Sequence, residues 1–216
     1  MKYDTFIFDL DGTLVSHEMN FSYLREELER IIVSYGYNAK GMIWEAGLID
    51  TLKHIRGDMN KIGLDGDRAI GDAKKRIYDY EMERAPFSSL IPGTIDVLKH
   101  LRSKGCKIAI VTRNNRQSAE ISVKNAGISE YVDLLIARGD TPTMKPDPAQ
   151  FVHVLEILGS SADSTVVVGD YVHEIEAGNA LGCYTIGVLT GTGDTESLKI
   201  ADVVVYSLKD IIKLFK

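Results

Sequence analysis

The chain has 216 residues, a length that suits one medium-sized domain or one domain with a smaller insert. Its hydrophobic content of 44% and charged content of 26% are typical of a globular protein with a hydrophobic core. The net charge of −6 provides no basic footprint for nucleic acid, and no apolar run is long enough to cross a membrane.

The two cysteines, Cys106 and Cys183, each stand at the start of an apolar run that predicts a strand. Two buried free thiols fit a reducing compartment better than a disulfide framework. The first predicted strand begins almost at the N-terminus, which indicates that no signal peptide precedes it. We therefore expect a cytoplasmic protein, and the sequence does not distinguish a monomer from a dimer.

The first predicted element is a buried strand over residues 5–8, which ends in two carboxylates, Asp9 and Asp11, followed by Gly12 and Thr13. Open α/β sheets bind ligands at the carboxyl ends of their strands. Two carboxylates this close repel each other unless they share a cation or a proton. Taken alone, the pattern is equally compatible with an Asp-Gly turn that leaves the core.

Residues 17–88 contain no strand pattern, and their apolar residues recur at helical spacing in three groups: Leu24, Leu28, Ile31, Ile32 and Tyr35; Ile43, Leu48, Leu52 and Ile55; and Ile70, Ala73, Ile77 and Tyr80. Gly57, Gly63 and Gly66 are predicted to mark the joints. We predict an α/β core of residues 1–16 and 89–216 and an all-helical cap of residues 17–88. Because the insert leaves the sheet directly after the acidic turn, it is expected to form a lid. The region of Met42 and Trp44 fits the small core of this cap better than a substrate contact.

From residue 94 onward, predicted helices and strands alternate. The helices cover residues 94–104, 116–126, 147–159, 174–181 and 208–215, and the strands cover residues 106–112, 132–137, 164–169, 183–188 and 202–205. Asp147 is expected to cap its helix and Pro148 to occupy the first turn. Nearly all-apolar strands alternating with helices predict a three-layer α/β fold with a doubly wound parallel sheet.

Polar groups follow three of the later strands. They are Thr112, Arg113 and Asn114 after the second strand, Lys145 in the loop after the third, and Asp170 with Glu174 after the fourth. Because all parallel strands end at the same edge, these groups are expected to meet Asp9 and Asp11.

This set of residue types suits phosphoryl chemistry. Asp9 and Asp170 offer oxygen ligands to a hard cation such as Mg²⁺, while Thr112 and Lys145 suit phosphoryl oxygens. One carboxylate can attack phosphorus and a second can move the proton. Each of these residues also has a simpler interpretation outside a functional site. Thr112 could cap the following helix, Lys145 could be a solvated loop residue, and Arg113 and Asn114 could face water.

Four ordered motifs resemble those of the haloacid dehalogenase superfamily. They are Asp9-Leu10-Asp11-Gly12-Thr13, Thr112 at a strand end, Lys145-Pro146-Asp147-Pro148, and Gly169-Asp170 with an acid four positions later. Order and spacing match across nearly the whole chain. Ile91-Pro92-Gly93-Thr94 also resembles the return from a helical cap into the core, and Gly187 to Gly191 resembles the stretch after the fifth strand.

The resemblance implies a role for each motif. Asp9 would be the nucleophile and a Mg²⁺ ligand, and Asp11 would be the general acid and base and give its backbone carbonyl to the metal. Thr112 and Lys145 would hold the phosphoryl group, with Arg113 and Asn114 as further phosphate-binding candidates. Asp170 would bind Mg²⁺ directly, and Glu174, where many relatives have aspartate, would support the metal shell. His17 and His173 flank the expected site without a family role.

The acid at position 11 narrows the expected reaction. Dehalogenases of the superfamily lack an acid there, so Asp11 favours phosphate-ester chemistry. The helical insert resembles that of phosphoglycolate phosphatase-like and β-phosphoglucomutase-like members. We therefore expect a Mg²⁺-dependent phosphatase that acts on a small phosphorylated metabolite through an aspartyl-phosphate on Asp9. A sugar phosphomutase of the β-phosphoglucomutase type and a non-catalytic binding protein are the alternatives.

Overall fold

The structure, a computed structural model, describes residues 2–16, 19–44 and 47–215. The chain divides into two compact units, one of Met1–His17 with Ala85–Lys216 and the other of Glu18–Arg84. Within the described part of the chain, no helix is both long and apolar enough to span a membrane.

The first unit is built on a six-stranded parallel sheet with the strand order β5-β4-β1-β6-β7-β8. Its strands are β1 (Thr5–Phe8), β4 (Lys107–Asn115), β5 (Leu134–Arg138), β6 (Thr165–Gly169), β7 (Tyr184–Val188) and β8 (Val203–Val205). The strand β1 lies between β4 and β6, with Thr5 opposite both Lys107 and Thr165. The predicted doubly wound α/β fold is confirmed, and its first strand occupies the middle of the sheet.

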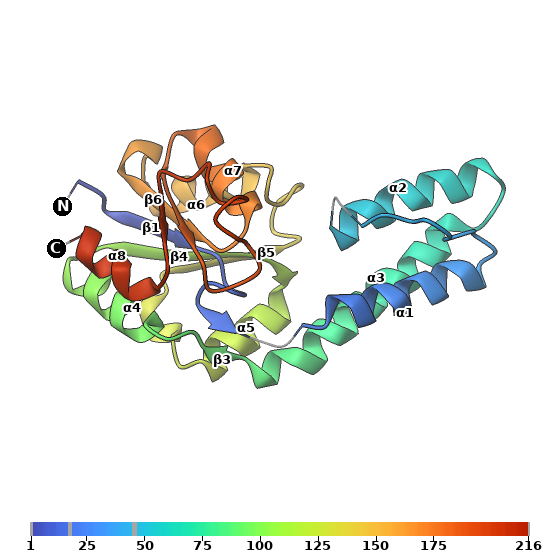
Figure 1. The fold of residues 1–216 in the computed structure, drawn as a ribbon, viewed down its shortest axis with the longest axis horizontal. Coiled ribbons are helices and arrows are strands. Elements are labelled where there is room, and N and C mark those ends of the chain that lie inside the picture. The colour runs from blue at the N-terminus through green and yellow to red at the C-terminus, as the bar shows by residue number, and fades with distance from the viewer. Residues whose placement is uncertain (1, 17–18, 45–46, 216) are drawn as a thin grey trace. The chain divides into compact units, whose positions relative to one another are not determined.

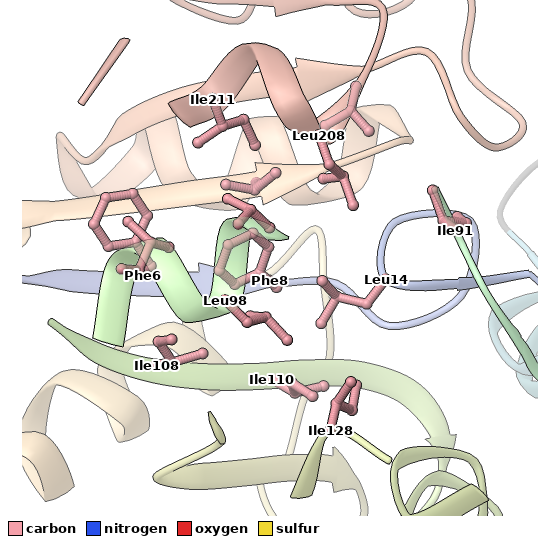
Figure 2. Close-up of a cluster of buried hydrophobic side chains, with 14 of the residues drawn as sticks. Phe6, Phe8, Leu14, Ile91, Leu98, Ile108, Ile110, Ile128, Leu208 and Ile211 are labelled. Carbon is pink, nitrogen blue, oxygen red and sulfur yellow. The ribbon is translucent and has the colours of Figure 1, made fainter. Parts of the chain in front are cut away.

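Helices cover both faces of this sheet (Figure 1). The helices α4 (Thr94–Ser103), α5 (Arg116–Asn125) and α8 (Leu208–Leu214) share one hydrophobic cluster with Phe6 and Phe8. The helices α6 (Ala149–Leu158) and α7 (Val172–Leu181) share another with Ile7. Alternating side chains of β1 therefore pack into the hydrophobic clusters on both faces of the sheet. Figure 2 shows Phe6 and Phe8 in the cluster that includes Leu208 and Ile211 of α8.

Short elements complete this unit. The strands β2 (Val15–Ser16) and β3 (Ser89–Leu90), which the apolar pattern does not predict, form an antiparallel pair. Three 3₁₀ turns, η1 (Ala85–Phe87), η2 (Ser129–Tyr131) and η3 (Ala162–Ser164), lie in connections.

Among its described residues, the second unit contains three helices, α1 (Phe21–Ser34), α2 (Leu48–Lys61) and α3 (Gly66–Arg84), around a hydrophobic core of its own. Trp44 is buried in that core and donates its indole N–H to Glu29 at 3.0 Å, as expected for a core residue rather than a substrate contact. One joint prediction is wrong, because Gly57 lies inside α2 rather than between helices. A Cβ at Gly57 would meet no atom within 4 Å, so no close contact requires glycine at this position.

Two details at element ends differ from the sequence prediction. The helix α6 begins at Ala149 with Pro148 at the N-cap, while the Asp147 carboxylate accepts a hydrogen bond from the Ala149 N–H at 2.9 Å. Cys106 and Cys183 each precede their strand by one residue, but both are buried and free as expected. Burial raises the pKa of the Cys183 thiol to about 11, which keeps it protonated and unreactive near neutral pH.

Candidate active site

The carboxyl ends of the three middle strands bring the predicted acids and the threonine to one edge of the sheet. Asp9 directly follows β1, and its N–H donates to the Val168 carbonyl at 2.9 Å, which extends the pairing with β6 by one residue. Thr112 lies in the neighbouring β4, where the register shifts between Val111 and Asn115. Asp170 follows β6. This is the edge at which open α/β sheets bind ligands.

Lys145 reaches this edge from the loop after β5 and is completely buried there. Its ammonium lies 2.5 Å from Asp9 Oδ1 and 2.6 Å from Glu174 Oε1, and it donates to the Val111 carbonyl at 2.9 Å. Burial opposes the charge on Lys145, but the two carboxylates outweigh it and raise the pKa of the ammonium. Lys145 is therefore a fixed positive charge beside Asp9, and the solvated-loop alternative is wrong.

Asp9 occupies an environment that resists its negative charge. Burial raises the pKa of Asp9 well above its ordinary value, and the nearby charges of Glu174, Asp170 and Asp11 raise it further, against the opposing effect of Lys145. The Asp9 side chain is nevertheless 11% exposed, so it is accessible to a substrate. Lys145 therefore offsets only part of the effect that burial and the neighbouring carboxylates have on the pKa of Asp9.

Asp170 is held by a cradle formed from two loops. Thr13 Oγ1 donates to Asp170 Oδ1 at 2.9 Å, and the Thr192 N–H donates to Oδ2 at 2.9 Å. Gly12 adopts a φ of +85°, and a Cβ at Gly191 would lie 1.9 Å from Asp170 Oδ2. Burial raises the pKa of Asp170, while these two hydrogen bonds partly offset the effect. Both glycines are required by the close approach of this carboxylate.

Asn114 contacts the second acid of the motif. Its Nδ2 donates to Asp11 Oδ2 at 2.6 Å, and its backbone N–H donates to Thr112 Oγ1 at 3.1 Å. Asn115, not Thr112, caps α5 by accepting the Ser118 N–H at 2.9 Å, so the helix-cap interpretation of Thr112 is wrong. Thr112 itself is 1% exposed. Asn114 is placed to orient Asp11, a contact that the sequence did not predict.

Gln150 and the Thr13–Thr192 pair support the site and were missed at the level of sequence. Gln150 is fully buried in α6, accepts the Lys145 N–H at 3.2 Å and donates to the Thr112 carbonyl at 3.3 Å. It therefore ties the Lys145 loop to β4. A single glutamine in an amphipathic helix carries no sequence signal for this role, since its partner Thr112 lies 38 residues away.

The donor set fits a divalent cation in its chemistry. Glu174 Oε2 is buried and, among the described residues, has no hydrogen-bond partner, while Glu174 Oε1 pairs with Lys145. Four carboxylates, Asp9, Asp11, Asp170 and Glu174, thus share this edge with one buried lysine. No three His, Cys, Asp or Glu side chains of the described residues converge as a ready-made metal cage. Carboxylate oxygens are the ligand type that hard cations such as Mg²⁺ prefer.

Arg113 lies in β4 directly after Thr112, and His173 is the second residue of α7. Arg113 Nη1 donates to His173 Nδ1 at 2.8 Å, which joins the end of β4 to the start of α7. His17 lies outside the described residues.

Comparison with known proteins places this arrangement in a family. The sequence profile of the haloacid dehalogenase-like hydrolases matches residues 3–182. The chain therefore belongs to the haloacid dehalogenase-like hydrolase family, which confirms the expected family and the expectation of a hydrolase.

Sequence relatives within this family indicate the class of enzyme. The chain is 28% identical to the pyrophosphatase PpaX of Bacillus mycoides, over 99% of this chain and 97% of that protein. It is 27% identical to the phosphoglycolate phosphatase of Neisseria meningitidis, over 76% of this chain and 59% of that protein. Both names describe phosphatases, so the expected enzyme class, a phosphatase, is supported.

Solved structures confirm the fold. A predicted phosphoglycolate phosphatase from Haemophilus somnus superposes with a TM-score of 0.76 and 20% identity, covering 100% of this chain and 99% of that chain. A β-phosphoglucomutase from Clostridium difficile gives 0.68 and 20% identity, covering 97% of this chain and 93% of that chain.

Proposed function

We propose that the protein is a Mg²⁺-dependent phosphatase that hydrolyses a small phosphorylated metabolite through an aspartyl-phosphate on Asp9. The observation that carries the proposal is the buried contact of 2.5 Å between the Lys145 ammonium and Asp9, at a sheet edge that also holds Thr112, Asp11 and Asp170. A complete set of nucleophile, proton donor and phosphoryl-binding groups argues against a protein that only binds.

The metal would be held by Asp9 and Asp170, by the Asp11 backbone carbonyl, and with the support of Glu174. When bound, Mg²⁺ supplies positive charge that screens phosphoryl oxygens from the carboxylates and favours the ionised form of Asp9. The raised pKa of Asp9 and the unsatisfied Glu174 Oε2 support this assignment.

The reaction then has two transfers at one phosphorus atom. An Asp9 oxygen forms a bond to phosphorus while the bond to the ester oxygen breaks, and Asp11 gives its proton to that leaving oxygen. Asp11 then takes a proton from water as the water oxygen attacks phosphorus, which releases phosphate and restores Asp9. Asn114 keeps Asp11 oriented for both proton transfers, and Lys145 and Thr112 hold the phosphoryl oxygens.

We propose that residues 17–88 act as a cap that excludes bulk water during the reaction. Their compact helical core supports the idea of a separate moving body. The relatives named pyrophosphatase and phosphoglycolate phosphatase suggest small anionic substrates, of which 2-phosphoglycolate is the first to test.

The test measures Mg²⁺-dependent release of phosphate from p-nitrophenyl phosphate by the wild type and by Asp9→Asn. We expect the substitution to lower kcat by at least about a thousandfold, because it removes the nucleophile. Asp163→Asn, which changes an exposed aspartate in η3, is the matched control and should retain wild-type activity. Mass spectrometry of acid-quenched enzyme should detect a phosphorylated Asp9 peptide.

Two results would contradict the proposal. Failure of the wild type to hydrolyse any phosphate ester with Mg²⁺ present would remove the enzymatic claim. Conversion of β-glucose 1-phosphate to the 6-phosphate without free phosphate would show a phosphomutase instead.

A further inference from the structure

Gln150 is a polar side chain in an apolar part of the fold, and the proposed reaction gives it no step. It is the second residue of α6 and is fully buried, while its neighbour Phe151 and the residue one turn further on, Val154, belong to a hydrophobic cluster. A buried amide lowers stability unless its oxygen and its N–H groups find partners. The partners of Gln150 therefore indicate what the residue does.

The amide of Gln150 contacts three backbone groups. Its Oε1 accepts the N–H of Lys145 at 3.2 Å, and its Nε2 donates to the carbonyls of Thr112 at 3.3 Å and Ala137 at 3.4 Å. A backbone N–H only donates and a carbonyl only accepts, so these partners fix which end of the amide is oxygen and which is nitrogen. The amide therefore joins three segments that lie far apart in the sequence.

The two carbonyls belong to neighbouring strands at the point where their pairing becomes irregular. The strands β4 and β5 pair in register up to Val111 and Ile136, and the register shifts beyond this pair. Thr112 and Ala137 follow directly. Such an irregularity disturbs the backbone hydrogen bonds between strands, and buried carbonyls there need other donors. Because the Gln150 amide donates to one carbonyl of each strand, it holds the two strands together at this position.

The same amide holds the backbone of both residues that are proposed to bind the phosphoryl group. It contacts Thr112 through the carbonyl and Lys145 through the N–H. Lys145 is also tied to β4 at the other end of its side chain, because its ammonium donates to the Val111 carbonyl at 2.9 Å. Since Thr112 directly follows Val111, the distance between the ammonium and Thr112 depends on both contacts. Only the Gln150 contact comes from a side chain, so it is the one that a substitution can remove.

A role in starting α6 does not explain these contacts. Pro148 occupies the N-cap of the helix, and the Asp147 carboxylate accepts the Ala149 N–H at 2.9 Å. The three contacts of Gln150 go to residues outside the helix. A leucine or methionine would fill a buried position of this size without any polar group. The amide is therefore better explained by the segments that it joins than by the helix that carries it.

We propose that Gln150 is a positioning residue of the proposed phosphatase, which holds the Lys145 loop and β4 at the spacing that lets the Lys145 ammonium and Thr112 contact the same phosphoryl group. The inference rests on the proposed function and adds a residue that acts through the two phosphoryl-binding groups without touching the substrate. The metal is proposed to be held by Asp9 and Asp170. Loss of the Gln150 amide should therefore affect the binding of phosphoryl oxygens more than the binding of Mg²⁺.

The first experiment measures kcat for p-nitrophenyl phosphate in Gln150→Met, which keeps the length of the side chain and removes its amide. A small displacement of groups that hold a reacting substrate can cost about a hundredfold in rate, so we expect kcat to fall by about tenfold to a hundredfold. Gln150→Asn keeps the amide on a shorter side chain that does not reach all three partners. Its kcat should lie between those of Gln150→Met and the wild type, and this variant carries the test if Gln150→Met does not fold.

Val154→Ala is the matched control for effects on the fold. Val154 is fully buried on the same face of α6, one turn from Gln150. The substitution removes apolar contacts and lowers the melting temperature, but it leaves the contacts of Gln150 in place, so the wild-type kcat should be kept. Wild-type kcat in a folded Gln150 variant, or an equal loss of kcat in Val154→Ala, would overturn the inference.

The second experiment observes Lys145 directly and needs no catalysis. The Lys145 ammonium is completely buried, so its hydrogens should exchange slowly and give a side-chain NMR signal in ¹⁵N-labelled protein, assigned by through-space correlations to Val111. We expect Gln150→Met to shift this signal and to speed its hydrogen exchange, while Val154→Ala keeps both. Calorimetry should show that Gln150→Met binds inorganic phosphate about tenfold more weakly in the presence of Mg²⁺, with the wild-type affinity for Mg²⁺ retained.

These measurements separate this inference from the proposed function. If the wild type hydrolyses no phosphate ester, the phosphatase proposal fails, while the ammonium signal still tests whether Gln150 positions Lys145. An ammonium signal and a phosphate affinity that are both unchanged in folded Gln150→Met would contradict the positioning role alone. Equal weakening of phosphate and Mg²⁺ would show a general loss of structure at the site and would also contradict it.

Discussion

Removal of the Lys145 ammonium tests how much its buried ion pairs with Asp9 and Glu174 contribute to stability and activity. The ammonium is completely buried between Asp9 and Glu174, so Lys145→Met leaves two carboxylates in a buried place without their cation. Breaking a buried ion pair on one side costs about 3–5 kcal/mol of folding free energy. We expect the free energy of unfolding to fall by this amount at pH 8 without metal. We also expect phosphatase activity to be lost, because Lys145 supplies the positive charge that both the phosphoryl group and Asp9 need.

The pH dependence of this loss follows from the direction of the Asp9 pKa. A carboxyl whose pKa is raised in the folded protein binds a proton more readily there than in the unfolded chain, so stability falls as pH rises through the folded pKa. Without Lys145 this effect grows. The penalty of Lys145→Met should therefore be largest at pH 8 and shrink as the pH falls and Asp9 takes up a proton.

Urea unfolding followed by circular dichroism, at several pH values without metal, measures the free energy of unfolding. Adding Glu174→Gln to Lys145→Met removes one of the stranded carboxylates and should recover part of the stability, without recovering activity. The reasoning is refuted if Lys145→Met unfolds within about 0.5 kcal/mol of the wild type at pH 8.

Three other substitutions probe separate features. Gly191→Ala places a Cβ where Asp170 Oδ2 lies 1.9 Å away, so a Mg²⁺ titration of activity should show weaker metal binding by at least about tenfold; unchanged metal dependence would contradict the cradle. Asn114→Asp puts a carboxylate where Nδ2 lies 2.6 Å from Asp11, and kcat should fall by about tenfold to a hundredfold, as steady-state assays would show. Gly71→Ala, within α3 where a Cβ meets nothing within 4 Å, should raise the free energy of unfolding by up to about 1 kcal/mol in a urea titration, and a loss of stability would count against the helix.

The sheet and the convergence of the main site residues followed from the sequence because both depend on local patterns. Apolar runs marked the strands, and in a parallel sheet the residues after Phe8, Val111 and Gly169 must share an edge. The contact of Lys145 with Asp9 requires the loop after β5 to fold back over the sheet edge. Local patterns do not predict such a loop conformation. Only the resemblance of the motifs to those of a known family indicated it.

Other contacts were not predictable because they depend on side chains that meet across long sequence separations. Asn114 was expected to bind phosphate, yet its amide lies on Asp11. Thr192 reaches Asp170 through its backbone N–H, a group that every residue except proline carries. The short β2–β3 pair has too few residues to leave a pattern. Element ends also shifted by one to three residues for a different reason, since they depend on local hydrogen bonds such as the one that the Asn115 side chain accepts at the start of α5.

The position of β1 at the centre of the sheet also affects how the chain folds. During synthesis Thr5–Phe8 emerges first, but its two partners are β4, from Lys107, and β6, from Thr165. This strand therefore stays unpaired until most of the chain has been made, and the closing of such distant contacts slows folding. The helices of Glu18–Arg84, whose contacts are local, can form in that interval. An apolar strand that stays unpaired for this long offers free backbone groups to other chains before the sheet forms around it.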